Sequence, residues 1–213
     1  MNDARLQSFK RVELQDATRL GAPLFVGAAL DSAWEKRCEE LARACDRLRL
    51  TGAQDLIDLN ARSFSAAGVP VVKEPTGLSR SDGKSPDGLS LVPWQNGKAV
   101  CLDVTVIYTL ADSYISAATR DARAAAELAA SRKEVKYAGL DGRHMFAPIA
   151  FENLAVPSAS TRQLLSYLGR RLADISGESR ETSYLFQRCS ILVQRFNAVL
   201  LHDSLPDRDC TDY

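Results

Sequence analysis

Residues 89–106 read LSLVPWQNGKAVCLDVTV, and this stretch carries the strongest structural pattern of the chain. Two apolar, β-prone segments, Leu89 to Trp94 and Lys98 to Val106, flank the dipeptide Asn96-Gly97. That arrangement is typical of two antiparallel strands joined by a type I′ turn, because both turn residues must adopt a positive φ. The sequence therefore predicts a β-hairpin centred on Asn96-Gly97.

The second strand of this hairpin contains one acid, Asp103, inside an apolar run. A charge in such a strand costs several kcal/mol unless it is paired or bound to a metal, so Asp103 is a candidate functional residue. A turn centred on Asn96-Gly97 puts Asp103 opposite Ser90, and Asp87 would then point to the other face of the sheet. The two acids can form one site only if the first strand is distorted, and we expect the distortion at Pro93, which cannot donate to a ladder.

Asp87 and a pair of lysines allow two interpretations each. Asp87 follows a proline and precedes a glycine, which is typical of a turn aspartate bonded to local backbone, but it can also be a metal ligand. Lys133 and Lys136 are three residues apart and share one helix face with Tyr137, either as a solvated surface or facing a phosphate. Glu152 can join a site or cap the following turn.

The rest of the chain predicts an α/β protein, with a small mixed sheet flanked by helices and a helical fragment at the N-terminus. We expect a loop over 70–88, a strand over 146–151 with Pro148 at an edge or bulge, and a disordered tail from residue 206. The last helix is apolar nearly all round, so we expect it to be buried. Helices are predicted over residues 31–50, 53–67, 113–139, 159–176 and 180–202.

Composition narrows the class of protein. The 213 residues include 27 Lys and Arg against 27 Asp and Glu, which argues against a free-standing nucleic-acid binder. Five cysteines without a C-x-x-C pair predict neither a disulfide framework nor a zinc site. With no signal-peptide pattern and no membrane span, we expect an intracellular protein, nuclear or cytoplasmic. The oligomeric state is left open.

Several short segments, in order along residues 66–203, resemble a known family. They resemble the C-terminal region of reverse-transcriptase open reading frames in non-LTR-type retrotransposons. Within that region they are similar to the restriction-endonuclease-like domain, a member of the PD-(D/E)xK nuclease superfamily. The segments are VPVVKEP at 69–75, GKSPDG at 83–88, LDVT at 102–105, KEVKYAGL at 133–140 and QRCS at 187–190.

The resemblance implies a Mg²⁺- or Mn²⁺-dependent endonuclease that hydrolyses phosphodiester bonds of DNA. Asp87 and Asp103 would bind the metal, and a lysine would assist the attacking water. The usual lysine two places after the second acid is replaced by Thr105. A helix lysine would take that role, either Lys133 or Lys136, and their spacing does not choose between them.

The chain also departs from the family pattern. Ser85 stands where a basic residue usually precedes the Pro-Asp pair, and the usual Arg-His helix is missing before Ser65. Residues 1–65 resemble the region after the palm of a related reverse transcriptase, while no Asp-Asp polymerase motif is present, which excludes polymerisation.

These features predict three parts: a helical fragment over 1–65, a restriction-endonuclease-like domain over 66–203 and a tail over 204–213. Our hypothesis is a transposon-derived remnant, or a gene model with an internal deletion, and the two departures from the family pattern count against its activity. The alternative is a non-catalytic interaction protein in which Asp103 is a structural acid paired with an arginine or with backbone amides.

Overall fold

The computed structural model describes residues 53–78, 85–140 and 142–204, together with a few positions nearer the N-terminus. Residues 47–198 form one compact unit, and residues 1–46 with 199–213 form another. In the second unit, β1 (Thr18–Arg19) pairs antiparallel with β2 (Ala22–Pro23). Most of the predicted helix over 31–50 and the predicted tail from 206 lie outside the described residues.

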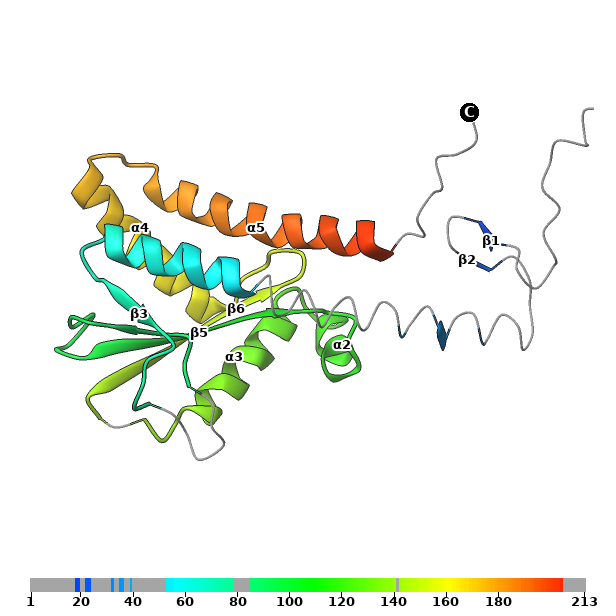
Figure 1. Ribbon diagram of the computed structural model, residues 1–213, viewed down its shortest axis with the longest axis horizontal. Helices are drawn as coiled ribbons and strands as arrows, with labels where there is room; N and C mark the ends of the chain where they lie inside the picture. The colour runs from blue at the N-terminus through cyan, green and yellow to red at the C-terminus, as the bar shows by residue number, and fades with distance from the viewer. Residues whose placement is uncertain are drawn as a thin grey trace, which may run out of the picture. The chain divides into compact units, whose positions relative to one another are not determined.

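The compact unit is built on a four-stranded mixed sheet with the order β3-β4-β5-β6 (Figure 1). Strands β3 (Val71–Lys73), β4 (Gly88–Ser90) and β5 (Ala99–Ile107) are antiparallel neighbours, and β6 (His144–Glu152) runs parallel to β5. The predicted mixed α/β class is therefore confirmed. Pro148 lies in β6 at the edge of the sheet, as predicted, where its missing N–H removes no ladder bond.

Helices cover both faces of this sheet (Figure 1). One face is covered by the helix over residues 53–66, by α4 (Ala159–Ser176) and by α5 (Glu181–Ser204). The other face is covered by α2 (Asp112–Ala118) and α3 (Ala124–Lys136). Among the described helices, none is long and apolar enough to cross a membrane.

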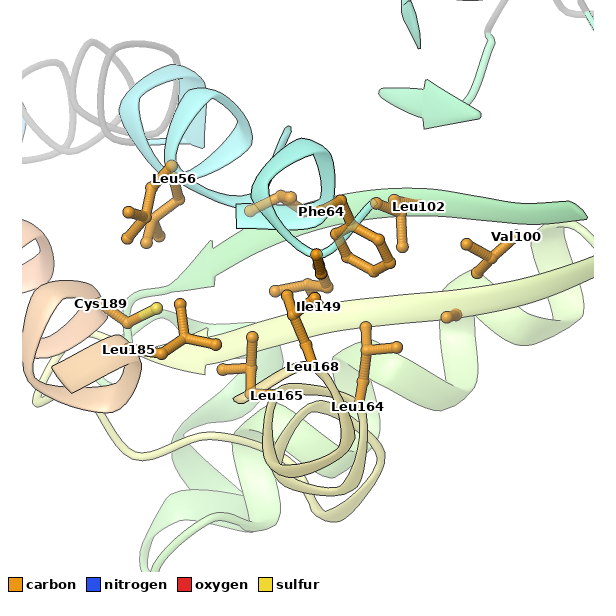
Figure 2. Close-up of a cluster of buried hydrophobic side chains, with 14 of the residues drawn as sticks. Leu56, Phe64, Val100, Leu102, Ile149, Leu164, Leu165, Leu168, Leu185 and Cys189 are labelled. Atoms are coloured by element: carbon orange, nitrogen blue, oxygen red, sulfur yellow. The ribbon is translucent and has the colours of Figure 1, made fainter. Parts of the chain in front are cut away.

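The larger core lies between the sheet and the first group of helices. Figure 2 shows Leu56 and Phe64 from the helix over 53–66 and Leu165 from α4 around Leu102 and Ile149 of the sheet. All five are at least 97% buried. This cluster is the main source of hydrophobic stabilisation in the unit.

Three predictions about the elements are wrong. The segment 70–88 is not all loop, because two β-branched valines pair with β4 as strand β3. The helix predicted over 113–139 is two helices, since Arg123 has a φ of +85° and the Glu152 carboxylate accepts from the amides at the start of α3. Helix α5 is buried on one stripe only, and Ile191 is 57% exposed.

Other helix ends agree with the prediction. Helix α4 covers the predicted range, with the Ser158 hydroxyl accepting from the amide of Thr161 and Gly177 at a φ of +75° after its last residue. The helix over 53–66 is followed by Gly68 at a φ of +72°, as predicted.

Candidate functional site

The hairpin has the predicted turn and the predicted distortion. Asn96 and Gly97 have φ values of +50° and +71°, as a type I′ turn requires, and they are flanked by a bridge between Gln95 and Lys98. A regular ladder continued from that bridge would put Ser90 opposite Asp103. The observed partners in β4 and β5 are instead Gly88 with Leu102 and Leu89 with Cys101. The first strand is therefore interrupted beyond Ser90, at the segment that contains Pro93.

This interruption brings the two acids to the same face of the sheet. The register moves by an odd number of residues, so Asp87, one residue before β4, comes opposite Asp103. Asp87 Oδ2 accepts a hydrogen bond of 2.6 Å from the backbone N–H of Val104. Where the β4–β5 ladder ends, the Asp87 carboxylate thus accepts the hydrogen bond of a β5 N–H in place of a backbone carbonyl.

Asp103 is held from the side of α3. It is 3% exposed, and its Oδ1 accepts a hydrogen bond of 2.8 Å from the Tyr137 hydroxyl. Its Oδ2 forms an ion pair with Lys133 Nζ. The acid expected to need a partner has two, a lysine and a phenol, where the structural interpretation expected an arginine or backbone amides.

Helix α3 can deliver these groups because it packs closely on the sheet. Alanine favours the helix, and its buried side is formed by alanines alone, Ala125, Ala126, Ala129 and Ala130. Small side chains let the helix approach Ile107 and Ala150, the sheet residues of the same cluster. The last turn of α3 then places Lys133 against Asp103.

The two lysines differ in what they contact. Lys133 reaches Asp103 directly, and its side chain remains 27% exposed. Lys136 Nζ donates to the Tyr137 hydroxyl at 3.0 Å and lies 4.5 Å from the centre of that ring. Lys133 is therefore the lysine that contacts Asp103 directly, while the charges of both lysines act on Asp87.

The environment changes the acidity of Asp87. Burial, together with the negative charge of Asp103, raises the pKa of Asp87 to about 6, against the opposing effects of the Val104 N–H and of Lys133 and Lys136. A raised pKa beside a second carboxylate and a lysine is typical of functional sites, although ion-pair networks produce it too.

Sequence reasoning assigned no role to Tyr137, which matters here. Tyr137 is 2% exposed, and its hydroxyl also lies 3.1 Å from the backbone oxygen of Ser85. A tyrosine next to the paired lysines was the available sign, because a buried hydroxyl needs partners. Glu152 lies outside the site, and its Oε1 accepts from the N–H groups of Ala125 and Ala126 at 3.2 and 3.4 Å.

The two acids suit a divalent cation whose remaining coordination positions are filled by water or by substrate. Within the described ranges, no group of three or more His, Cys, Asp or Glu side chains could hold a metal ion. Mg²⁺ is commonly bound by one or two carboxylates, with waters and substrate phosphates completing its octahedron. Asp103 Oδ2 already pairs with the Lys133 ammonium, so a bound ion would share or replace that contact. The residues fit Mg²⁺ or Mn²⁺ bound by Asp87 and Asp103.

A scan against protein-family models and a search of curated proteins found no match to this chain. The resemblance of residues 66–203 to a restriction-endonuclease-like domain, and of 1–65 to a reverse-transcriptase fragment, stays a prediction. The compact unit includes the helix over 53–66, whose Leu56 and Phe64 are part of its core.

Proposed function

We propose that this protein is a retroelement-derived endonuclease that hydrolyses phosphodiester bonds of DNA with Mg²⁺ or Mn²⁺. The observation that carries the proposal is the convergence of Asp87, Asp103 and Lys133. The three residues come from three separate parts of the chain, and an irregular strand is needed to bring the acids together. An accidental surface cluster would need no such irregularity.

Each residue has a role that follows from its contacts. Asp87 and Asp103 would hold the cation, which when bound polarises the phosphate and lowers the pKa of a bound water. Val104 N–H fixes one oxygen of Asp87 and leaves the other for a ligand. Lys133 is half-buried beside Asp103, where its ammonium can donate to a water or to a phosphate oxygen.

The substrate assignment rests on local charge, because the chain as a whole is neutral. The positive charge beside the acids comes from Lys133 and Lys136 at the C-terminal end of α3, while Arg132 on the same helix lies over the Tyr114 ring. Such a patch can bind a phosphate backbone with a strong dependence on salt. Ser85 supplies no cation where the family pattern has one, so we expect weak DNA binding and slow cleavage.

Plasmid nicking tests the proposal. The full chain is incubated with supercoiled DNA and Mg²⁺ or Mn²⁺, and wild type is compared with Asp103→Ala. Asp58→Ala is the matched control, because Asp58 also pairs with a lysine but belongs to the helix over 53–66, which packs on the face of the sheet opposite α3. We expect nicking by wild type and by the control but not by Asp103→Ala. Equal activity of wild type and Asp103→Ala, or none in either, would overturn the enzyme assignment.

A second candidate is a non-catalytic interaction protein. It is favoured by the partners that both acids already have, Val104 N–H for Asp87 and Lys133 with Tyr137 for Asp103. In that case the acids stabilise the packing of α3 on the sheet. Calorimetric titration with Mn²⁺ separates the two candidate functions. A non-catalytic protein would bind no Mn²⁺ at these acids, so wild type and Asp103→Ala would give the same titration.

A further inference from the structure

The Tyr137 hydroxyl lies where three parts of the site meet. It is within hydrogen-bond distance of Asp103 Oδ1 at 2.8 Å, of the Ser85 backbone oxygen at 3.1 Å and of Lys136 Nζ at 3.0 Å. Ser85 is two residues before Asp87, so one hydroxyl connects the segments that carry the two acids. Tyr137 itself is the residue that follows the last turn of α3.

The chemistry of a phenol sets what this hydroxyl can do. It has one proton, which Asp103 Oδ1 or the Ser85 oxygen can accept, and its oxygen accepts from the Lys136 ammonium. The ring is fixed by Phe146 at a centroid distance of 4.6 Å and by the Lys136 ammonium over its face. Packing therefore determines where the hydroxyl lies, before any ligand binds.

We propose that Tyr137 is a positioning residue of the carboxylate site, whose hydroxyl donates to Asp103 Oδ1 and so orients that carboxylate for both acids to bind one divalent cation. The proposal rests on the proposed metal-dependent function and adds to it a residue that does not itself contact the cation. With Oδ1 engaged by the phenol, Oδ2 is the oxygen of Asp103 that faces Lys133, and a bound cation would share or replace that contact.

The hydroxyl can be removed without removing the ring. Tyr137→Phe keeps the stacking on Phe146 and the face that Lys136 covers, and it deletes only the hydrogen bonds. Tyr114→Phe is the matched control. Tyr114 packs against the same alanine cluster and has Arg132 over its ring at 4.9 Å, and no described contact links it to either acid.

The first test measures Mn²⁺ binding to the full chain by the EPR signal of free Mn²⁺. Losing a residue that orients a metal ligand typically weakens metal binding by about 10- to 100-fold. We therefore expect the Mn²⁺ affinity of Tyr137→Phe to be at least about tenfold weaker than that of wild type. The Mn²⁺ affinity of Tyr114→Phe should equal that of wild type. In the nicking assay, the half-saturating Mn²⁺ concentration should rise by the same factor, while the rate at saturating Mn²⁺ stays near wild type. A residue that only stabilised the fold would not separate these two quantities.

The outcomes distinguish this proposal from the proposed function. Equal Mn²⁺ affinity of wild type and Tyr137→Phe overturns the positioning role, whatever the nicking assay shows. Weaker affinity in Tyr137→Phe with no nicking by any protein supports the positioning role and overturns the nuclease.

A measurement on the wild type avoids any folding defect of the variant. With tyrosine labelled at the ζ carbon, the Tyr137 resonance should shift on addition of Mg²⁺, and the Tyr114 resonance should not. A Tyr137 resonance that ignores Mg²⁺ would contradict the proposal.

Discussion

The two faces of β5 show how one strand serves stability on one side and chemistry on the other. Val100, Leu102 and Val104 belong to the aliphatic core, where Figure 2 shows Leu102 next to Phe64. Asp103 and Ile107 point toward α3. The first face is packed by large side chains from three helices, and the second by alanines.

This difference has a physical consequence. Large aliphatic side chains bury the most apolar area, so the first face contributes most of the hydrophobic free energy. Alanines bury less, but they let α3 lie close enough for Lys133 and Tyr137 to reach Asp103. The comparison predicts that core variants change stability alone, whereas variants on the α3 face change stability and ligand binding together.

Phe64→Ala should have the largest effect on folding. Phe64 is fully buried and contacts the Trp94 ring at a centroid distance of 4.8 Å. Removing a buried phenylalanine leaves a cavity and lowers the free energy of unfolding by about 3–5 kcal/mol, which urea denaturation followed by circular dichroism would measure. Mn²⁺ affinity of the folded fraction should not change. A loss below about 1 kcal/mol would show that the aliphatic face is not the stabilising one.

Asp103→Asn, on the face of β5 toward α3, should have the second-largest effect on stability. The amide can still accept from Tyr137, but Lys133 loses its counter-ion in a half-buried position. We expect the free energy of unfolding to fall by about 2–3 kcal/mol and Mn²⁺ binding to be lost. Adding Lys133→Met should restore part of the stability, because it removes the unpaired charge. If the double variant is no more stable than Asp103→Asn, the ion pair does not explain the loss.

The local patterns of the sequence predicted much of this fold. Asn96-Gly97 between two β-prone segments determined the hairpin, and the odd offset between Asp87 and Asp103 required an irregular strand near Pro93, which the structure has. Helix α4 was predicted because its start, its end and its apolar stripe agree. All these features depend on residues close together in the chain.

What the sequence did not predict depends on contacts between distant segments. The break before α3 is stabilised by Glu152, 27 residues from the amide that it accepts from. Strand β3 has three residues and gains its hydrogen bonds only from β4. Lys133 and Lys136 are equivalent by spacing, and only the way α3 lies on the sheet makes Lys133 the partner of Asp103.

Asp87→Asn should stabilise the protein at neutral pH. Because the pKa of Asp87 is raised from 3.8 to about 6, the folded state binds a proton more readily than the unfolded state between these values. The ionised carboxylate therefore lowers stability as the pH rises through this range, and the cost is complete above about pH 6. Neutral asparagine should raise the free energy of unfolding by about 1–2 kcal/mol at pH 8.

The sign of this effect can be checked against pH. Unfolding curves at pH 4 and pH 8 should show the gain of Asp87→Asn at pH 8 and little gain at pH 4. Metal binding should be weaker in the variant at both. A destabilised variant at pH 8 would mean that the bond from Val104 N–H outweighs the burial of the charge.

The smallest effect should come from Lys73→Ala, which tests a second lysine–aspartate pair away from the α3 face. Lys73 Nζ lies 2.9 Å from Asp58 Oδ1, but the two side chains are 49% and 37% exposed, whereas those of Lys133 and Asp103 are 27% and 4% exposed. The hydrogen bond from Lys73 lowers the pKa of Asp58, so the pair stabilises the protein above the unfolded pKa of 3.8 and loses that effect at lower pH. Exposed pairs contribute little to stability, and we expect the free energy of unfolding to fall by less than about 0.5 kcal/mol, and by less still in high salt.

Lys133→Ala, measured by the same urea curves, should lower the free energy of unfolding more, because it leaves Asp103 buried without its cation. Equal losses of stability in Lys73→Ala and Lys133→Ala would mean that burial against the alanines of α3 does not strengthen a lysine–aspartate pair. The contrast between the two faces of β5 would then hold for apolar packing but not for ion pairs.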